Sequence, residues 1–228
     1  MMDFGLAERI EVYREFVNPV IAEIKTYSPI HGDLVRNRNV IDILRAYENA
    51  NAVGISYITA REFKGDFENL KLICKETELP VLRKDFILSK EEIERTASAE
   101  ASAILLIARL LGHKTAEFVD LAHESDLEAL VEVHSAEDIQ IVEESKAEII
   151  GINNRDIMKL EKDDGDVSVT ERLSGLISVK GRIVVSASGI RTLEDLKRAL
   201  KCADAVLIGT ALMMADDPES KLRSFVEG

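Results

Sequence analysis

The stretch IIGINNRD (149–156) shows the pattern that decides the fold, because a short, apolar, β-branched run ends there in amide, guanidinium and carboxylate side chains. Four further stretches have the same form: AEIKTYSPIHG (22–32), VLRKDFI (81–87), LVEVH (130–134) and VVSASGI (184–190). A parallel strand covered on both faces reads as a continuous apolar run, and a (β/α)8 barrel carries its reactive side chains at the carboxyl ends of its strands. The five stretches therefore predict polar strand ends that meet around a single pocket.

Eight apolar runs of this kind alternate with stretches of helical period along the whole chain. The segment TLEDLKRALK (192–201), for example, places Leu193, Leu196 and Leu200 on one helical face. Strands and helices that alternate without a break in composition favour one closed α/β domain. We therefore predict a single (β/α)8 TIM barrel over residues 1–228, with strands at 19–24, 53–58, 79–83, 103–107, 129–133, 148–152, 182–187 and 204–208.

The first eighteen residues precede the first predicted strand and form an extra element. A helical period places four of their side chains on one face, and these are Leu6, Ile10, Tyr13 and Val17. Residues 1–18 therefore predict a short amino-terminal helix that packs against the barrel.

Charge and composition restrict the partners that the chain can have. Its formal net charge is −13 with acidic residues spread along it, whereas a nucleic-acid-binding face is basic. The longest apolar run, AILLIARLL (103–111), is short and interrupted by Arg109, and the first residues lack a signal-peptide core. Cys74 and Cys202 lie in helix-like stretches without a CxxC or HxH pairing, which indicates a reducing compartment and no metal site. We predict a cytoplasmic protein that binds neither nucleic acid nor a membrane.

Four charged side chains at predicted strand ends are candidates for acid–base chemistry. Glu23 and Lys25 are two residues apart on the first strand and point to the same side, Lys84 follows the run PVLR, and Glu132 lies inside ALVEVH. Structural explanations exist too: the lysines as solvated charges, and Glu132 as the partner of an arginine. A buried carboxylate is rare unless paired, and strand ends converge in a barrel, so the functional interpretation is favoured. His134 shares the parity of Glu132 and is interpreted as structural.

Two further groups of strand-end residues predict a site for an anion. Asn153 and Arg155 have the same parity, and amide and guanidinium groups suit hydroxyl and carboxylate or phosphate partners. Small residues close the last two strands, where this architecture often presents backbone N–H groups to a phosphate. Glycines also end strands for steric reasons, so each alone is weak evidence. The predicted cradle consists of Ser188, Gly189, Gly209 and Thr210.

Seven motifs, in their order along the chain, point to a known family. They are EIKxxSP, LRKDFI, LLIARLL, LVEVH, GINNRD, SxSGI and LIGTALM, and the similarity runs from Ile21 to Leu222. The chain resembles the indole-3-glycerol phosphate synthases, the barrel enzymes of the tryptophan pathway. The resemblance implies that 1-(2-carboxyphenylamino)-1-deoxyribulose 5-phosphate closes a pyrrole ring with loss of carbon dioxide and water. It also implies that no metal or organic cofactor takes part.

The resemblance implies a role for each candidate residue. Lys84 would be the general acid that protonates the ketone of the substrate, and Glu132 would stabilise the cationic intermediate and assist proton removal. Glu23 and Lys25 match a second acid–base pair that serves the dehydration step. The remaining residues would bind substrate: Asn153 and Arg155 would orient it, Phe86 would form an apolar wall for the anthranilate ring, and Lys25, Ser28, Ser188, Gly189, Gly209 and Thr210 would hold the phosphate.

Three positions depart from the family pattern, and two of the departures are small: Thr26 stands where a basic residue is common, and Ile30 where a small hydroxyl residue is common. The seventh-strand motif of the family reads SESGI, and Ala187 stands here where that glutamate would line the substrate pocket. This absence predicts an impaired or altered synthase. Two alternatives stay open: a phosphosugar-binding barrel with lost or altered catalysis, and a phosphoribosyl-sugar isomerase. Such isomerases usually work with a Cys/Asp or Asp/Asp pair, which fits Lys84 and Glu132 poorly.

Overall fold

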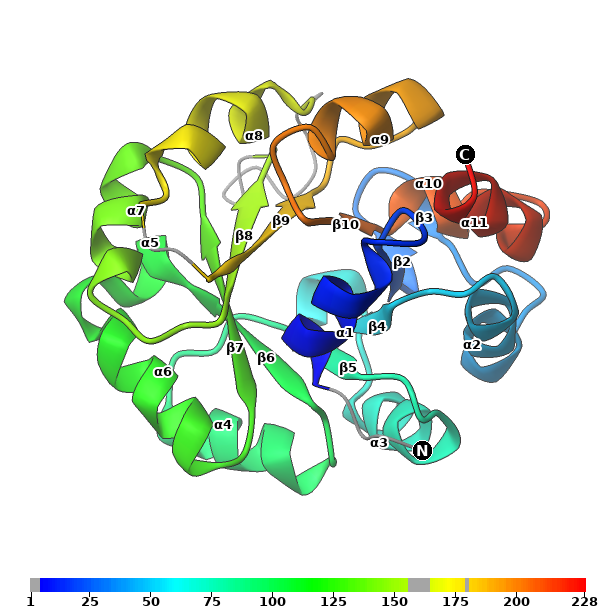
Figure 1. Ribbon diagram of the computed structural model, residues 1–228. Coiled ribbons are helices and arrows are strands. Elements are labelled where there is room, and N and C mark those ends of the chain that lie inside the picture. The colour runs from blue at the N-terminus through cyan, green and yellow to red at the C-terminus, as the bar shows by residue number, and fades with distance from the viewer. Residues whose placement is uncertain (1–4, 156–164, 179–180) are drawn as a thin grey trace.

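The computed structural model describes residues 5–155, 165–178 and 181–228, and within them eight parallel strands close into a barrel (Figure 1). Going round the barrel, β1 is followed by β10, β9, β8, β7, β6, β5 and β4, which pairs with β1 again. The predicted (β/α)8 barrel is confirmed, and each strand lies within two residues of its predicted bounds. The strands are β1 Val20–Ile24, β4 Gly54–Ile58, β5 Val81–Lys84, β6 Ala103–Ile107, β7 Glu128–Val133, β8 Ile149–Asn153, β9 Ile183–Ala187 and β10 Ala205–Ile208.

Helices follow the strands and form the outer layer of the barrel (Figure 1). The longer ones are α2 Val40–Asn49, α3 Phe67–Glu76, α4 Lys90–Ser98, α6 Thr115–Glu124, α7 Ala136–Glu143, α8 Ser168–Leu173, α9 Leu193–Ala199 and α11 Pro218–Val226. Shorter elements lie in the loops: α5 Ala108–Leu111, α10 Thr210–Met213, the 3-10 turns η1 Arg61–Phe63, η2 Gly112–Lys114 and η4 Ser174–Leu176, and the hairpin β2 Tyr27–Ser28 with β3 Gly32–Asp33. None of these described helices is long and apolar enough to cross a membrane.

Side chains with hydroxyl or amide groups fix where several helices begin. Asn39 accepts backbone N–H groups at the start of α2, and Asp42 returns a bond to the backbone N–H of Asn39, which completes a capping box. Thr192 and Asp195 make the same arrangement at the start of α9. Such caps satisfy N–H groups that have no partner inside the helix, so they fix the residue at which each of these two helices begins.

The strands separate two apolar layers. Alternate residues point into the barrel and pack there on one another, as Leu82, Leu105, Leu130, Val185 and Leu207 do. The other residues of each strand point outward and pack under the helices. The barrel interior is thus a filled core, and the functional cavity lies above it rather than through it.

Helix α1, Leu6–Tyr13, closes the amino end of the barrel and lies across the ring of strands (Figure 1). Leu6 and Ile10 are fully buried among the side chains of the barrel interior. Glu128, the first residue of β7, accepts the backbone N–H groups of Leu6 and Ala7 at the start of the helix. The helix expected in residues 1–18 is therefore present from Leu6, and residues 1–4 of that segment lie outside the described residues. The helix packs on the barrel at the end opposite the cavity.

Candidate active site

A cavity of about 580 Å³ lies at the carboxyl ends of the strands. All eight strands, or the residues directly after them, contribute to its wall. Within the part of the chain that the structure describes, five lysine or arginine and three acidic side chains line it: Lys25, Lys84, Arg155, Arg191 and Lys221, with Glu23, Asp85 and Glu132. A chain with a net charge of −13 thus has a cavity with more cationic than acidic side chains, which favours an anionic ligand.

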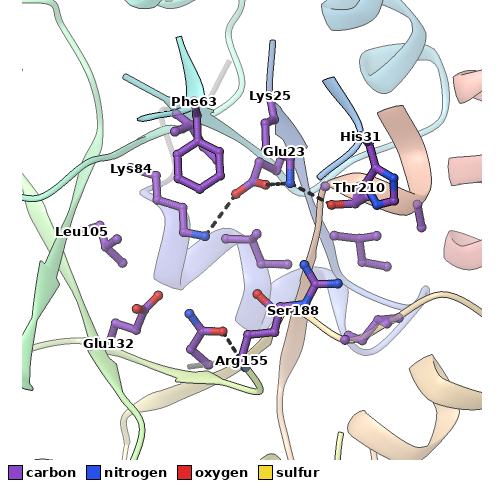
Figure 2. A pocket seen from close by; sticks show the side chains of 18 of the residues that line it. Glu23, Lys25, His31, Phe63, Lys84, Leu105, Glu132, Arg155, Ser188 and Thr210 are labelled. Atoms are coloured by element: carbon purple, nitrogen blue, oxygen red, sulfur yellow. Dashed lines mark hydrogen bonds and ion pairs between the residues drawn. The ribbon is translucent and has the colours of Figure 1, made fainter. Parts of the chain in front are cut away.

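Glu23 lies between the two lysines predicted for acid–base chemistry (Figure 2). Its Oε2 atom is 3.2 Å from the Nζ atom of Lys84, and its Oε1 atom is 3.9 Å from the Nζ atom of Lys25. The side chains of Glu23 and Lys25 are 5% and 2% exposed, so little water screens the charges. The ion pair between Glu23 and Lys84 joins β1 to β5 at the cavity wall and directs the Lys84 side chain into the cavity.

Lys25 also reaches the end of the last strand. Its Nζ atom donates a hydrogen bond to the Oγ1 atom of Thr210 at 2.7 Å. Between them, Gly209 leaves room for Glu23, because a Cβ atom at Gly209 would lie 2.1 Å from the Oε1 atom of Glu23. Position 209 therefore needs a glycine for steric reasons, which was one of the two explanations considered for the glycines at strand ends. Gly209 also lines the cavity.

Glu132 enters the cavity from β7, and Figure 2 shows its carboxylate and the Lys84 amine directed into the same space. Its side chain is 1% exposed. The Oε1 atom has no hydrogen-bond partner among the described residues, although the Nε2 atom of His134 lies 3.4 Å away. Burying a carboxylate oxygen without a hydrogen bond is costly, and such groups concentrate at functional sites. Glu132 therefore brings a buried carboxylate to the cavity wall.

The GINNRD motif places both predicted substrate-binding side chains in the cavity wall. Asn153 ends β8, and its Oδ1 atom accepts the backbone N–H of Arg155 at 3.0 Å. This bond turns the chain sharply after the strand and orients both side chains. Asn153 and Arg155 are therefore held close to each other at the end of β8.

Asn154 binds three neighbouring segments together beneath the cavity and was not singled out from the sequence. Its Nδ2 atom donates to the Oγ atom of Ser186 and to the carbonyl oxygens of Ala187 and Ser188, at 3.0 to 3.1 Å. Its Oδ1 atom accepts the backbone N–H and the hydroxyl of Thr170, both at 3.0 Å. The buried amide thus fixes the position of the loop after β9.

That loop has an unusual backbone at the predicted anion cradle. Ser188 and Gly189 both have positive φ, +66° and +75°. A Cβ atom at Gly189 would lie 2.7 Å from the carbonyl oxygen of Gly165, so glycine is required there for space as well as for conformation. A non-glycine residue in the left-handed region, as Ser188 is, often marks a functional site. Both residues line the cavity.

A network around Arg83 positions the neighbouring Lys84. Arg83 is 1% exposed, and its guanidinium projects away from the cavity. Its Nε atom is 2.9 Å from the hydroxyl of Thr59, and further bonds reach Asp85, Glu92 and Thr96. The loop from β5 to α4 is thereby tied to β4 and to the helix that follows. The arginine in the RKD sequence has a structural role, and the lysine beside it faces the cavity.

Phe86, Ser28 and Ala187 differ in how they relate to the cavity: the first lines it, and the other two lie behind or below its wall. Phe86 lines the cavity and packs on the barrel interior. Ser28 is fully buried and is absent from the described lining; its hydroxyl accepts the backbone N–H groups of Ile30 and His31 at 3.3 Å. Ser28 thus shapes the turn that carries two lining residues. Ala187 is 3% exposed and points into the barrel interior just below the cavity.

Several lining residues were not predicted, and they come from segments whose sequences carry weaker signals. Phe63 lies in η1, and its ring centroid is 5.8 Å from the Nζ atom of Lys25. Arg191 directly follows the SGI sequence, so its position next to the predicted anion cradle could have indicated that it lines the cavity. His31 and Lys221 lie beyond strand ends, in a hairpin and in α11, where no local pattern indicates a ligand. The structure describes no group of three or more His, Cys, Asp or Glu side chains arranged to hold a metal ion.

Fold and site together define a class of protein: a (β/α)8 barrel with paired acidic and basic side chains in one cavity at the carboxyl ends of its strands. The chain belongs to the indole-3-glycerol phosphate synthase family, whose model matches residues 3–225. The resemblance drawn from its motifs is confirmed.

Individual relatives agree with this family. The chain is 60% identical to the indole-3-glycerol phosphate synthase of Pyrococcus abyssi over 228 residues, which cover 100% of this chain and 98% of the relative. It is 59% identical to the protein of the same name from Pyrococcus furiosus, with 100% and 99% of the two chains covered. The solved structure of 3-hexulose-6-phosphate synthase from Salmonella typhimurium has a TM-score of 0.72 at 16% identity, covering 91% of this chain and 96% of that chain. This last likeness concerns the fold alone.

Proposed function

We propose that the chain is an indole-3-glycerol phosphate synthase, a carboxy-lyase that acts in tryptophan biosynthesis. Its substrate would be 1-(2-carboxyphenylamino)-1-deoxyribulose 5-phosphate, which loses carbon dioxide and water as the pyrrole ring closes. The observation that carries the proposal is the meeting of Lys84, Glu23, Lys25 and Glu132 in one cavity of a chain that belongs to this family.

In the first step, the ring carbon that bears the carboxylate attacks the ketone carbon of the substrate. Lys84 donates a proton to the ketone oxygen, which becomes a hydroxyl group, and the aromatic ring and its nitrogen carry the positive charge that develops. Glu132 faces this charge with a buried carboxylate and stabilises it. Carbon dioxide then leaves, and the electrons of its bond to the ring restore the aromatic system.

In the second step, the new hydroxyl group leaves as water and the neighbouring carbon loses a proton. Glu23 and Lys25 serve this step as an acid–base pair, because their charged groups lie 3.9 Å apart and are almost fully buried. Glu23 also lies 3.2 Å from the amine of Lys84, so the carboxylate is shared by the two lysines.

The phosphate would bind at the part of the cavity wall that the ends of β9 and β10 form. Ser188, Gly189, Gly209 and Thr210 present the ends of β9 and β10, and Lys25 adds a positive charge through its bond to Thr210. Asn153 and Arg155 would orient the carboxylate and hydroxyl groups, and Phe86 would contact the anthranilate ring. Ser28 would act through the turn that it shapes rather than by direct contact with the phosphate.

The proposal includes the partners and the compartment of the protein. Its partner is a phosphorylated small molecule, and the acidic body outside the cavity disfavours nucleic acid and anionic membrane surfaces. A cytoplasmic location fits the two free cysteines, Cys74 and Cys202. Neither cysteine belongs to the described cavity wall, which disfavours an isomerase with a Cys/Asp pair.

The test is to mix the protein with the carboxyphenylamino-deoxyribulose phosphate and to follow the fluorescence of the indole product. We expect turnover by the unchanged chain and a loss of 10²- to 10⁴-fold in kcat for Lys84→Met, as is typical when a general acid is removed. The matched control is Lys90→Met, which removes a lysine with a side chain 58% exposed on the following helix. Its kcat should not change.

Two outcomes would contradict the proposal. Absence of an indole signal from the unchanged chain would favour a binding protein, and equilibrium binding of the product indole-3-glycerol phosphate would then measure that function. Equal turnover by Lys84→Met and the unchanged chain would remove Lys84 from the mechanism.

A further inference from the structure

His134 lies directly behind the carboxylate of Glu132, at the point where β7 ends. The side chains of Glu132 and His134 are 1% and 4% exposed, and the Nε2 atom of His134 is 3.4 Å from the Oε1 atom of Glu132. Neither ring nitrogen of His134 has a hydrogen-bond partner within the described residues. A buried imidazole beside a buried carboxylate oxygen that also lacks a partner is costly unless the two share a proton.

The other side of the imidazole faces a second carboxylate, Asp138 on α7. The Nδ1 atom of His134 is 3.8 Å from the Oδ2 atom of Asp138, and the same oxygen accepts the backbone N–H of His134 at 2.8 Å. Asp138 is itself fixed, because its backbone N–H donates to the Oγ atom of Ser135 at 3.2 Å. Arg109 on α5 lies 3.9 Å from that oxygen through its Nε atom.

Three side chains therefore lie in a row from the cavity to the outer layer of the barrel: Glu132, His134 and Asp138. Glu132 belongs to β7, Asp138 to the first turn of α7, and His134 to the short loop that joins them. In both the Nε2–H tautomer and the doubly protonated ring, the Nε2 atom carries a proton and lies 3.4 Å from the Oε1 atom of Glu132. A small change in the distance and direction of this contact would complete a hydrogen bond.

We propose that His134 is a positioning residue for the reaction, which holds the Glu132 carboxylate in its productive orientation through an Nε2–H donor and is itself oriented by Asp138. The inference rests on the proposed function, since it needs Glu132 to face the cationic intermediate. A carboxylate held by one donor keeps its second oxygen directed at the cavity, which is the arrangement that favours charge stabilisation without reorganisation.

Two substitutions of His134 distinguish the effect of its Nε2–H donor from the effect of the volume of its ring. In His134→Gln the side-chain amide places an N–H group near the former Nε2 atom, whereas in His134→Asn the amide reaches only the former Nδ1 position beside Asp138. We expect kcat to fall about 10- to 100-fold in His134→Asn, which corresponds to one lost hydrogen bond to a charged group. KM should change by less than about threefold, and His134→Gln should recover most of kcat.

The matched control is His123→Asn. His123 is also a histidine beside a carboxylate, with its Nε2 atom 2.8 Å from the Oε1 atom of Glu148, but that pair lies near the amino ends of the strands. Its kcat should be unchanged. The inference is wrong if His134→Asn retains full kcat, or if His134→Gln and His134→Asn lose kcat equally.

A measurement without substrate separates this inference from the proposed function. The imidazole ¹⁵N and ¹H resonances of His134 report whether its Nε2 atom carries a hydrogen-bonded proton. We expect the Nε2–H resonance to shift in Glu132→Gln and to stay constant in Glu148→Gln. A constant resonance in Glu132→Gln would overturn the role of His134 even in an active enzyme, whereas absent turnover with a shifted resonance would overturn only the proposed reaction.

Discussion

Position 187 is the main departure of this chain from the motif that its resemblance implies. Ala187 is buried at the end of β9, and its neighbours in register are Asn153 on β8 and Leu207 on β10, both in the cavity wall. A longer acidic side chain at this position would reach the cavity from below. The alanine leaves the cationic groups of the cavity with one fewer carboxylate.

Ala187→Glu is therefore expected to raise kcat. A hydrogen bond to a charged group contributes roughly 1.5–3 kcal/mol, which is roughly a ten- to hundred-fold effect on rate when the bond matters in the transition state. Steady-state indole fluorescence of both chains measures the effect. Ala187→Gln is the matched control, since it has nearly the same shape without the charge and should gain much less. Equal turnover by the alanine and glutamate chains would refute the impairment predicted from the motif.

How far the sequence predicts the site differs from residue to residue. Lys84, Glu132, Asn153 and Arg155 end apolar runs, and strand direction alone carries such side chains to one end of a barrel, where all four line the cavity. Ser28 is different, because the turn after β1 directs its hydroxyl to nearby backbone N–H groups. No periodic pattern records the direction of a side chain in a turn.

At the scale of elements, the loop from β5 to α4 shows how a buried ion network fixes a reactive group. The side chain of Arg83 is 1% exposed and lies 2.9 Å from the Oδ2 atom of Asp85, while the side chains of Asp85 and Glu92 are 18% and 34% exposed. Lys84, Asp85 and Phe86 all line the cavity, and Asp85 also binds Arg83, whose guanidinium points away from the cavity. Within the sequence RKDF, Arg83 therefore has a structural role and the three residues after it reach the cavity.

Arg83→Met should destabilise the fold and lower activity together. Removing one partner of a buried ion network typically costs about 3–5 kcal/mol, because a buried charge loses its compensation. The partial exposure of the two carboxylates puts the expected loss near the lower end, and kcat should fall because the Lys84 loop loses its anchor. Chemical unfolding and indole fluorescence measure the two effects.

Arg45→Met is the control for that prediction. Arg45 also bridges two carboxylates, Glu48 and Glu76, at 2.7 and 2.9 Å, but its side chain is 47% exposed. Water screens such a pair, so its loss should change stability far less and leave kcat unchanged. Similar losses in both variants would show that burial does not decide the role of Arg83.

Strands and helices could be predicted because local sequence patterns determine them. Features that depend on contacts between distant residues could not. The eight strands follow from continuous apolar runs, and side-chain caps mark the starts of five helices, α2, α3, α7, α9 and α11. The networks of Arg83 and Asn154 join segments up to 34 residues apart, so neither one is visible in the spacing of the sequence. The hairpin of β2 and β3 is two residues per strand, which is too short for a period of two to be recognised.

For the whole molecule, the structure separates the two ends of the barrel. The cavity occupies the carboxyl ends of the strands, and α1 seals the amino ends with Leu6 and Ile10. The described part of the amino-terminal segment, residues 5–18, therefore lies at the end of the barrel opposite the pocket. This division matches the general behaviour of the fold, in which one face carries chemistry and the other carries stability.

Ile10→Ala tests that division directly. Ile10 is fully buried against the barrel interior, so its truncation should lower the free energy of unfolding by about 2–5 kcal/mol through lost burial and the cavity left behind. Because the site lies at the opposite end, kcat should stay unchanged at temperatures where the variant is folded. Guanidinium unfolding and indole fluorescence, measured on the same samples, give the two quantities.

Val12→Ala is the control on the same helix, since Val12 is 40% exposed and contributes little to the core. Its stability should stay within about 0.5 kcal/mol of the unchanged chain. The division between the ends would be wrong if Ile10→Ala lowered kcat in the folded state, because a change at the sealed end would then reach the catalytic groups through the filled core. Unchanged kcat with a large loss of stability would establish that α1 supports the fold and that the strand ends around Lys84 and Glu132 work independently of it.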